Sequence, residues 1–279
     1  MKVAAIQMVS ATSVPANLDA ARKLLTQAAA QGAELAVLPE YFCLLGARDT
    51  DKLGIQEVFG AGPIQDFLAE TARALKLWVV GGTLPLTVPA SRQIEGGTGQ
   101  RVFNSSLVYS PRGDCVARYD KIHLFRYDNG RERYDESAVL QRGLEPVMFE
   151  LPSRDGHAWR VGLSVCYDLR FPELYRGYAQ RGADLLLVPS AFTHTTGQAH
   201  WEVLLRARAI ENLAFVAAAA QGGRHENGRS TWGQTLLADP WGVVLAQLPS
   251  GEGVVVHELD MASLQQRRGQ LPALTHRVL

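Results

Sequence analysis

The sequence has few cysteines and no excess of charge, and both shortages exclude classes of protein. Its 279 residues include 3 cysteines, Cys43, Cys115 and Cys166, an odd number spread widely along the chain. No Cys-X-X-Cys pair or Cys/His spacing typical of a structural zinc site occurs, so neither a disulfide framework nor a bound metal is expected. The 28 basic residues equal the 28 acidic ones, and a neutral chain without a basic cluster is not typical of a nucleic-acid binder.

Long apolar runs are also missing. The longest, residues 185–192 and 213–220, fall far short of the roughly 20 apolar residues that a membrane-spanning helix needs. The N-terminus has one basic residue, Lys2, and a short apolar run broken by Gln7, which favours a first β-strand over a signal peptide. We therefore expect a cytoplasmic protein that contacts neither a membrane nor nucleic acid.

The composition that remains is that of a globular α/β protein. Hydrophobic residues make up 47% and charged residues 20% of the chain, which excludes a disordered or fibrous protein. Apolar runs predict strands at 3–9, 35–38, 77–84, 159–165, 184–188, 214–220 and 253–259. Helical periodicity predicts helices at 18–28, with Asn17 as N-cap, and at 64–75, 172–181 and 201–212. Hairpins are predicted around 111–114 and 239–242, and loops at 89–100 and 126–145. Without a repeat or a shift in composition, residues 1–279 are predicted to form a single domain in which helices cover mixed sheets.

Cys166 is the first candidate for chemistry. It lies where an apolar strand ends and a helix opened by Pro172 begins. Such a turn carries a side chain to the carboxyl edge of a sheet, where helix N-terminal amides favour a thiolate. On position alone, a buried packing cysteine is the commoner interpretation. Cys43 and Cys115 lack this setting and are interpreted as packing residues.

A cysteine nucleophile needs a base, and none of the 7 histidines lies in a pattern that selects it. Glu40 follows the strand predicted at 35–38, where burial could raise its pKa enough for it to act as the base. The alternative is a solvated glutamate at a strand end. Lys121 also ends a strand and could stabilise an oxyanion, or face water as most lysines do.

Together, the segments around these three residues resemble the nitrilase superfamily of carbon–nitrogen hydrolases, whose Glu–Lys–Cys triad occurs in this chain order. Leu38-Pro39-Glu40 is similar to the glutamate motif, residues 120–125 to the lysine motif, and residues 166–173 to the cysteine motif. The similarity runs from residues 3–8 to residues 239–242, nearly the whole chain. It implies an α-β-β-α sandwich with mixed sheets that commonly forms a homodimer or higher homo-oligomer through a helical face, here the helices at 172–181 and 201–212.

The resemblance also implies a role for each residue. Cys166 would attack an amide carbon and form a thioester, Glu40 would move the protons, and Lys121 with the Tyr167 backbone N–H would hold the oxyanion. Glu136 matches a second glutamate that supports the triad, by fixing either Lys121 or the substrate amide. No cofactor is required by this chemistry.

Residues 189–192, 196–202 and 205–211 resemble the Nit branch, which contains omega-amidases and deaminated-glutathione amidases, and residues 218–225 favour the second kind. The expected partner is therefore a small-molecule amide of a carboxylic or 2-oxo acid. The residues expected to line its site are Phe192, Thr195, Thr196 and Arg170. Arg170 ranks below the hydroxyls, because Asp168 and Glu173 are close in sequence and could pair with it.

Two alternatives stay open at this point. The substrate could be a nitrile, an N-carbamoyl amine or an unrelated aliphatic amide. The chain could also be a catalytically silent binding protein that has kept the fold.

Overall fold

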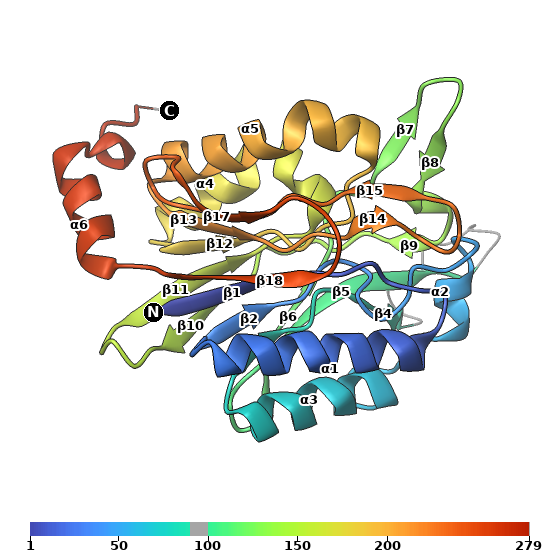
Figure 1. The fold of residues 1–279 in the computed structure, drawn as a ribbon. Helices are drawn as coiled ribbons and strands as arrows, with labels where there is room; N and C mark the ends of the chain where they lie inside the picture. Colours follow the sequence, from blue (N-terminus) through green and yellow to red (C-terminus); the bar gives the residue numbers. More distant parts are fainter. Residues whose placement is uncertain (90–99, 279) are drawn as a thin grey trace.

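The computed structural model describes residues 1–89 and 100–278, which form two mixed β-sheets packed face to face with helices on their outer faces (Figure 1). The first sheet has the order β18 (Gly253–Glu258), β1 (Lys2–Gln7), β2 (Leu35–Val37), β3 (Trp78–Val80), β5 (Val102–Tyr109), β4 (Leu84–Thr87), with β6 (Cys115–Asp120) and β9 (Leu140–Gln141) also paired to β5. The second has the order β10 (Met148–Pro152), β11 (Ala158–Leu163), β12 (Leu185–Leu187), β13 (Phe215–Ala218), β16 (Thr235–Ala238), β17 (Val244–Leu248). The α-β-β-α sandwich expected from the sequence is confirmed.

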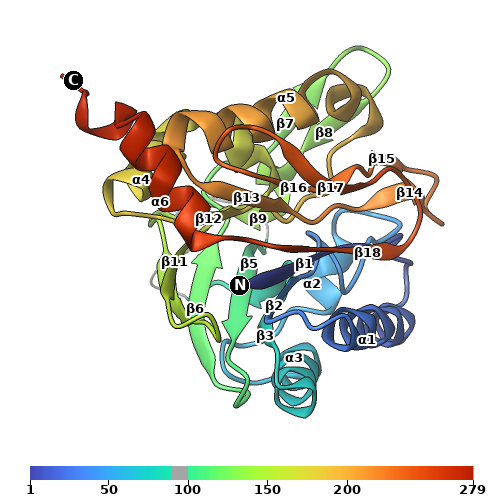
Figure 2. The same ribbon diagram turned by 60° about the vertical axis from the view of Figure 1, so that its left-hand side comes forward.

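Each sheet has its own pair of covering helices. In the view turned by 60°, α1 (Val14–Ala30) and α3 (Pro63–Leu75) lie outside the first sheet, and α4 (Pro172–Gln180) and α5 (His194–Asn212) lie outside the second (Figure 2). The last α-helix in the described residues is α6 (Met261–Gln270), which the sequence did not predict. Arg268 on α6 donates to the carboxylate of Asp184, 2.8 Å away, and so ties this helix to the second sheet.

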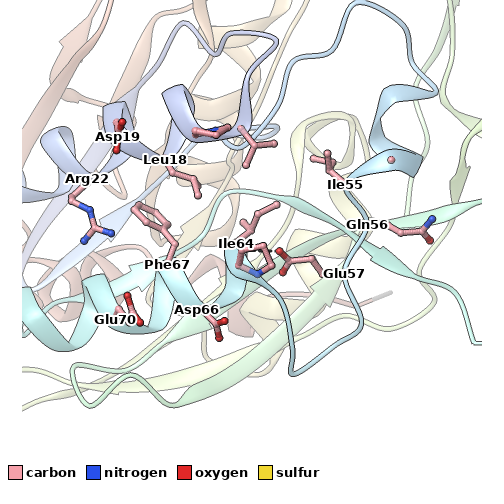
Figure 3. A pocket seen from close by; sticks show the side chains of 14 residues that line it. Leu18, Asp19, Arg22, Ile55, Gln56, Glu57, Ile64, Asp66, Phe67 and Glu70 are labelled. Atoms are coloured by element: carbon pink, nitrogen blue, oxygen red, sulfur yellow. Dashed lines mark hydrogen bonds between the residues drawn. The ribbon is translucent and has the colours of Figure 1, made fainter.

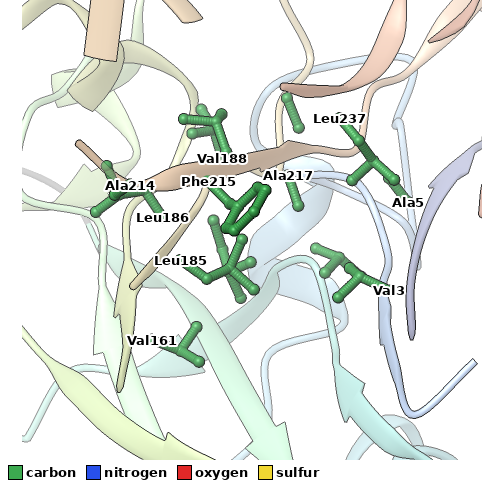
Figure 4. Close-up of a cluster of buried hydrophobic side chains, with 14 of the residues drawn as sticks. Val3, Ala5, Val161, Leu185, Leu186, Val188, Ala214, Phe215, Ala217 and Leu237 are labelled. Carbon is green, nitrogen blue, oxygen red and sulfur yellow. The ribbon is translucent and has the colours of Figure 1, made fainter. Parts of the chain in front are cut away.

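Central strands of the sandwich, such as β2, β12 and β13, are apolar along their whole length because both of their faces are buried. On β1, Val3 and Ala5 belong to the cluster that includes Leu185 and Leu237 of the second sheet (Figure 4). The alternate β1 residues, Ala4 and Ile6, belong to a second cluster that contains the buried faces of α1 and α3. This two-sided burial explains why the sequence shows continuous apolar runs here rather than alternation.

Two helices begin earlier than their apolar periodicity indicates. The first starts at Val14, with Pro15 in its first turn, so Asn17 is not the N-cap. Asn17 is instead buried inside the first turn, where its amide donates to the carbonyls of Ala11 and Cys43. The helix predicted at 201–212 starts at His194, and the Thr193 hydroxyl caps it by accepting from the Thr196 N–H. The polar first turn of this helix offers no periodic signal.

The segment predicted as a loop at 126–145 is partly regular, and that prediction is wrong. It contains an antiparallel hairpin of β7 (Arg126–Asp128) and β8 (Arg133–Asp135), followed by the 3₁₀ helix η2 (Glu136–Ala138) and then β9. The turn uses Gly130, whose φ of 81° is in the left-handed region. The hairpin strands are charged and largely exposed, so they lack the apolar alternation by which a strand is recognised.

Three further differences concern strands and loops. The strand predicted at 77–84 is interrupted at Gly81-Gly82 and continues as β4. The sequence did not predict β10, nor the hairpin of β14 (Gly222–Arg224) and β15 (Ser230–Trp232). Most of the loop expected at 89–100, with its Gly96-Gly97-Thr98-Gly99 run, lies outside the described residues.

Within residues 1–89 and 100–278, no helix combines the length and the apolar character needed to cross a membrane.

Candidate active site

Glu40, Lys121 and Cys166 come together at a point where strand ends of both sheets meet. Glu40 follows β2 and Lys121 directly follows β6, both in the first sheet, while Cys166 follows β11 in the second. Their exposed fractions are only 1%, 0% and 8%. Three ionisable side chains of different chemistry are thus enclosed together in the interior, which is typical of a functional site.

The Lys121 ammonium is the centre of this arrangement. Its Nζ lies 2.9 Å from Glu40 Oε1, and 2.9 Å and 2.8 Å from the two carboxylate oxygens of Glu136. Of the two partners considered for Glu136, the structure therefore places Lys121 in direct contact. Glu136 reaches this position from η2, and it also accepts hydrogen bonds from the Tyr41 hydroxyl and the Phe125 N–H.

The Glu40 carboxylate is held from several sides. Oε1 also accepts from Asn104 Nδ2 at 2.9 Å, and Oε2 accepts from the Ala191 N–H at 3.0 Å. The Cys166 thiol lines the same hollow as Glu40, and the charge of this carboxylate acts on it. Sequence reasoning missed Asn104, although a polar residue within the wholly buried strand β5 is a signal that could have identified it.

The electrostatics of the site determine which group carries the proton. Burial raises the pKa of Glu40, against the opposing charge of Lys121. Burial, and then the charge of Glu40, raise the pKa of the Cys166 thiol well above its usual range. Burial alone would lower the pKa of Lys121, but the charges of Glu136 and Glu40 outweigh it and the net pKa is raised. Burial and the charge of Glu40 thus favour the neutral thiol of Cys166, and the charges of Glu136 and Glu40 favour the ammonium of Lys121.

The backbone at Cys166 forms a sharp turn. Its φ of 51° is in the left-handed region, and the 3₁₀ helix η3 (Cys166–Arg170) begins at this residue. The Tyr167 N–H lies in the first turn of η3, where backbone donors lack a partner within the helix. The N–H suggested for an oxyanion site therefore belongs to the residue that directly follows Cys166, at the start of η3.

Asp168 holds this turn in place. Its carboxylate accepts from the Val165 N–H at 2.8 Å, from the Tyr119 hydroxyl at 2.6 Å and from the His123 N–H at 3.0 Å. It also lies 2.7 Å from His123 Nδ1, and it makes no ion pair with Arg170, a pairing that the sequence had left possible. The hydrogen bonds of the turn occupy the Asp168 carboxylate, and Arg170 makes its contacts with other residues.

Of the residues expected to bind the substrate, the structure places some beside Cys166 and one away from it. Phe192, Thr196 and Arg170 line a hollow next to Cys166. The Arg170 guanidinium lies 5.4 Å from the centre of the Phe192 ring. Thr196 is buried and its hydroxyl contacts that of Thr193, whereas Thr195 is exposed, donates to Glu132 and lines no hollow beside Cys166.

A second hollow adjoins Cys166 on the side of Glu40 and Glu136. It contains side chains that no sequence pattern singled out, from four separate parts of the chain: Tyr41, Asp49, Lys52, Tyr134 and Arg229.

The other two cysteines lie away from these hollows. Cys43 is buried, 3.7 Å from the Thr83 carbonyl, in agreement with a packing role. Cys115 is exposed on β6, so its interpretation as a packing residue is wrong.

A much larger cavity of about 820 Å³ lies elsewhere, between α1 and α3 (Figure 3). Its buried carboxylate, Glu57, accepts hydrogen bonds from the Ile64 and Gln65 N–H groups and so satisfies the start of α3. This cavity includes none of the residues around Cys166.

Within the described part of the chain, no three His, Cys, Asp or Glu side chains are placed to hold a metal ion together.

Gly82 determines where the Glu40 segment can lie, and Gly82→Ala is expected to lower kcat at least about 10-fold. Its φ is +49°, and a Cβ at this position would lie 2.0 Å from the Pro39 carbonyl oxygen. The segment that carries Glu40 must therefore shift in the variant. A displacement of a catalytic group by about 1 Å can lower the rate about 10²-fold. Gly269→Ala is the control, because a Cβ at that position in α6 meets nothing within 4 Å. Steady-state kinetics that are equal for the two variants would contradict this account.

Comparison with known proteins places the chain in a family. Residues 2–269 match the carbon–nitrogen hydrolase family model. A deaminated glutathione amidase from Synechocystis sp. is 39% identical, over 99% of this chain and 97% of its own. The structure of Saccharomyces cerevisiae Nit3, a member of branch 10 of the nitrilase superfamily, matches with a TM-score of 0.85 and 28% identity, over 100% of this chain and 97% of that one.

A further solved relative carries acrylamide added at its active-site cysteine. It is a variant of the amidase from Nesterenkonia sp. AN1, with a TM-score of 0.74 and 28% identity, and the match covers 98% of each chain. The resemblance drawn from the three sequence motifs is confirmed, and the chain belongs to the carbon–nitrogen hydrolase family of the nitrilase superfamily.

Proposed function

We propose that this protein is an amidase that hydrolyses the terminal amide of a small carboxylic or 2-oxo acid and releases ammonia. Deaminated glutathione is the first choice of substrate, supported by the Synechocystis relative of that name. The observation that carries the proposal is the buried contact of the Glu40 carboxylate with the Lys121 ammonium in the hollow that Cys166 also lines. A base, an electrophilic donor and a nucleophile are what acyl transfer requires.

In the first step, Glu40 removes the proton from Cys166 as the sulfur attacks the amide carbon. Its raised pKa suits it to accept this proton. The carbonyl oxygen becomes an oxyanion, which Lys121 Nζ and the Tyr167 N–H stabilise. Each preorganised donor of this kind contributes about 3 kcal/mol.

In the second step, the carbon–nitrogen bond breaks and Glu40 delivers its proton to the leaving nitrogen, which departs as ammonia. The acyl group then remains on Cys166 as a thioester. Glu40, again a carboxylate, takes a proton from a water molecule as that water attacks the thioester carbon. The acid leaves, Cys166 regains its proton, and no cofactor is consumed.

Glu136 supports the cycle without exchanging a proton. Because its two oxygens lie 2.9 Å and 2.8 Å from Lys121 Nζ, it keeps the lysine protonated and fixes its direction. Lys121 can therefore strengthen its bond to the substrate oxygen as negative charge develops there.

A side-by-side assay of ammonia release tests the proposed function. The substrates are deaminated glutathione, 2-oxoglutaramate, an aliphatic nitrile and an N-carbamoyl amine at equal concentration. One of the two amides is expected to have the highest kcat/KM, since the nitrile offers no anion to bind. A highest value for the nitrile or the carbamoyl compound would refute the substrate assignment, while no turnover of any of them would favour a silent binding protein.

We also propose that the chain forms a homodimer through the face of α4 and α5. The α5 side chains Val203 and Ile210 are exposed, as are Trp241 and Val243 in the neighbouring turn, and Arg206 on α5 donates to the Gly242 carbonyl in that turn. An apolar surface of this kind is typical of a subunit interface. Sedimentation is expected to give about twice the chain mass of 30.5 kDa, and Ile210→Asp is expected to shift the protein toward monomer.

A further inference from the structure

Two cations that the proposed mechanism does not use lie beside Cys166. Lys52 belongs to the short helix α2 (Asp51–Gly54), and Arg229 lies between β14 and β15. Both line the hollow that Glu40, Glu136 and Cys166 also line. Their separation in the sequence explains why no motif indicated them.

Lys52 is enclosed but poorly satisfied. Its side chain is 12% exposed, and its Nζ lies 3.5 Å from Asp49 Oδ1 and 3.4 Å from the Asp49 carbonyl. The Tyr41 ring centre lies 4.7 Å away. Burial lowers the pKa of Lys52, against the opposing charge of Asp49. An ammonium has three donors, and long contacts to one residue leave room for a further acceptor.

Arg229 shares the same counterion. Its Nη1 lies 3.5 Å from Asp49 Oδ1, and its guanidinium lies 4.9 Å from the centre of the Tyr134 ring. Two cations therefore share Asp49. Asp135 also lines this hollow, but it accepts from the Ser137 hydroxyl and the Ser137 N–H, and Arg126 lies 3.9 Å from it. At Lys121, by contrast, one cation faces two carboxylates, Glu40 and Glu136. A substrate anion is therefore favoured near Lys52 and Arg229 and disfavoured beside the triad.

We propose that Lys52 and Arg229 form a subsite for the carboxylate at the end of the substrate opposite the reacting amide. This inference rests on the proposed amidase function and names its substrate class: ω-amides that carry a distal carboxylate. The subsite differs from the substrate-binding residues expected from the sequence. Thr195 lies outside both hollows. Arg170 lines the hollow that contains Phe192 and Thr196, where its guanidinium lies over the rings of Tyr167 and Phe192.

The test compares two amides of equal length, glutaramate, which ends in a carboxylate, and pentanamide, which ends in a methyl group. Lys52→Met removes the charge and keeps the length of the side chain, and Arg229→Gln is the companion variant. For each, the ratio of kcat/KM for glutaramate to that for pentanamide is expected to fall about 10- to 100-fold, the range for loss of one charged hydrogen bond. The loss should be in the KM of glutaramate rather than in kcat, since a distal carboxylate is bound equally in the ground and transition states.

Matched controls separate this role from a structural one. Lys23→Met also removes one lysine charge, from the exposed side of α1, and should leave the ratio as in the wild type. A fall in kcat/KM that is equal for both amides in Lys52→Met would make Lys52 a structural residue and overturn the proposal. A selective loss in Arg170→Met, with none in Lys52→Met, would place the anion in the other hollow and overturn it as well.

Failure of the proposed function itself would show as no ammonia from either amide, and a binding measurement then decides the subsite. Glutarate is expected to slow the alkylation of Cys166 by iodoacetamide in the wild type, and to do so far less in Lys52→Met. Absence of protection in the wild type, or equal protection in both proteins, would overturn the subsite.

Discussion

Cys166→Ala is expected to reduce ammonia release by roughly 10⁴- to 10⁶-fold, the scale on which loss of a covalent nucleophile acts. Without the sulfur no thioester forms, and neither Glu40 nor Lys121 can replace it. The variant should still fold, because the left-handed turn at Cys166 is fixed by its backbone bond to Pro189 and by Asp168. Single-turnover kinetics and thermal unfolding measure the two effects separately.

The other two cysteines provide matched controls. Cys43→Ala removes a buried thiol and should cost about 1 kcal/mol of unfolding free energy through the small cavity that it leaves, with activity retained. Cys115→Ala removes an exposed thiol and should change neither quantity. Substantial turnover by Cys166→Ala would refute the thioester mechanism.

Glu40→Gln is expected to lower kcat by about 10²- to 10⁴-fold, the usual contribution of a general acid–base group. Glutamine keeps the shape of the side chain and an oxygen for Lys121 and Asn104, but it cannot take the Cys166 proton. KM should change little, because Glu40 acts on protons rather than on the substrate tail. Steady-state kinetics test this split, and a variant with near wild-type kcat would remove Glu40 from the role of base.

The pH dependence of stability gives Glu40→Gln a second readout. Burial raises the pKa of Glu40 in the folded state, so between the unfolded and folded pKa values the folded protein binds more protons than the unfolded chain. The wild type therefore loses stability as the pH rises through this window, whereas glutamine does not titrate. Relative to the wild type, the Tm of Glu40→Gln is expected to rise as the pH increases above the ordinary glutamate pKa of about 4.3; a fall would contradict a raised pKa.

The sequence by itself determined the positions at which chemistry could occur. Glu40 and Cys166 follow strands whose last residues are buried and apolar, so these strand ends are visible as abrupt changes in polarity. Lys121 follows β6, which is partly exposed and carries Arg118 and Asp120, and that strand was predicted from the hairpin turn before it. The turn at 111–114 was predicted for a similarly local reason, since Pro-Arg-Gly-Asp sets the backbone of a hairpin. These features depend on neighbours along the chain, and the family motifs are of the same local kind.

Only the tertiary structure decided how those residues affect one another. The placement of Asn104 against Glu40 joins residues 64 positions apart, and Glu136 reaches Lys121 only because the chain between them folds back. The pKa of Cys166 is raised by burial and by the charge of Glu40, because a low-dielectric interior penalises the thiolate. Lys52 and Arg229 become neighbours only because folding places both at Asp49. A binding site is defined by distances in space, and no periodicity along the chain records these distances.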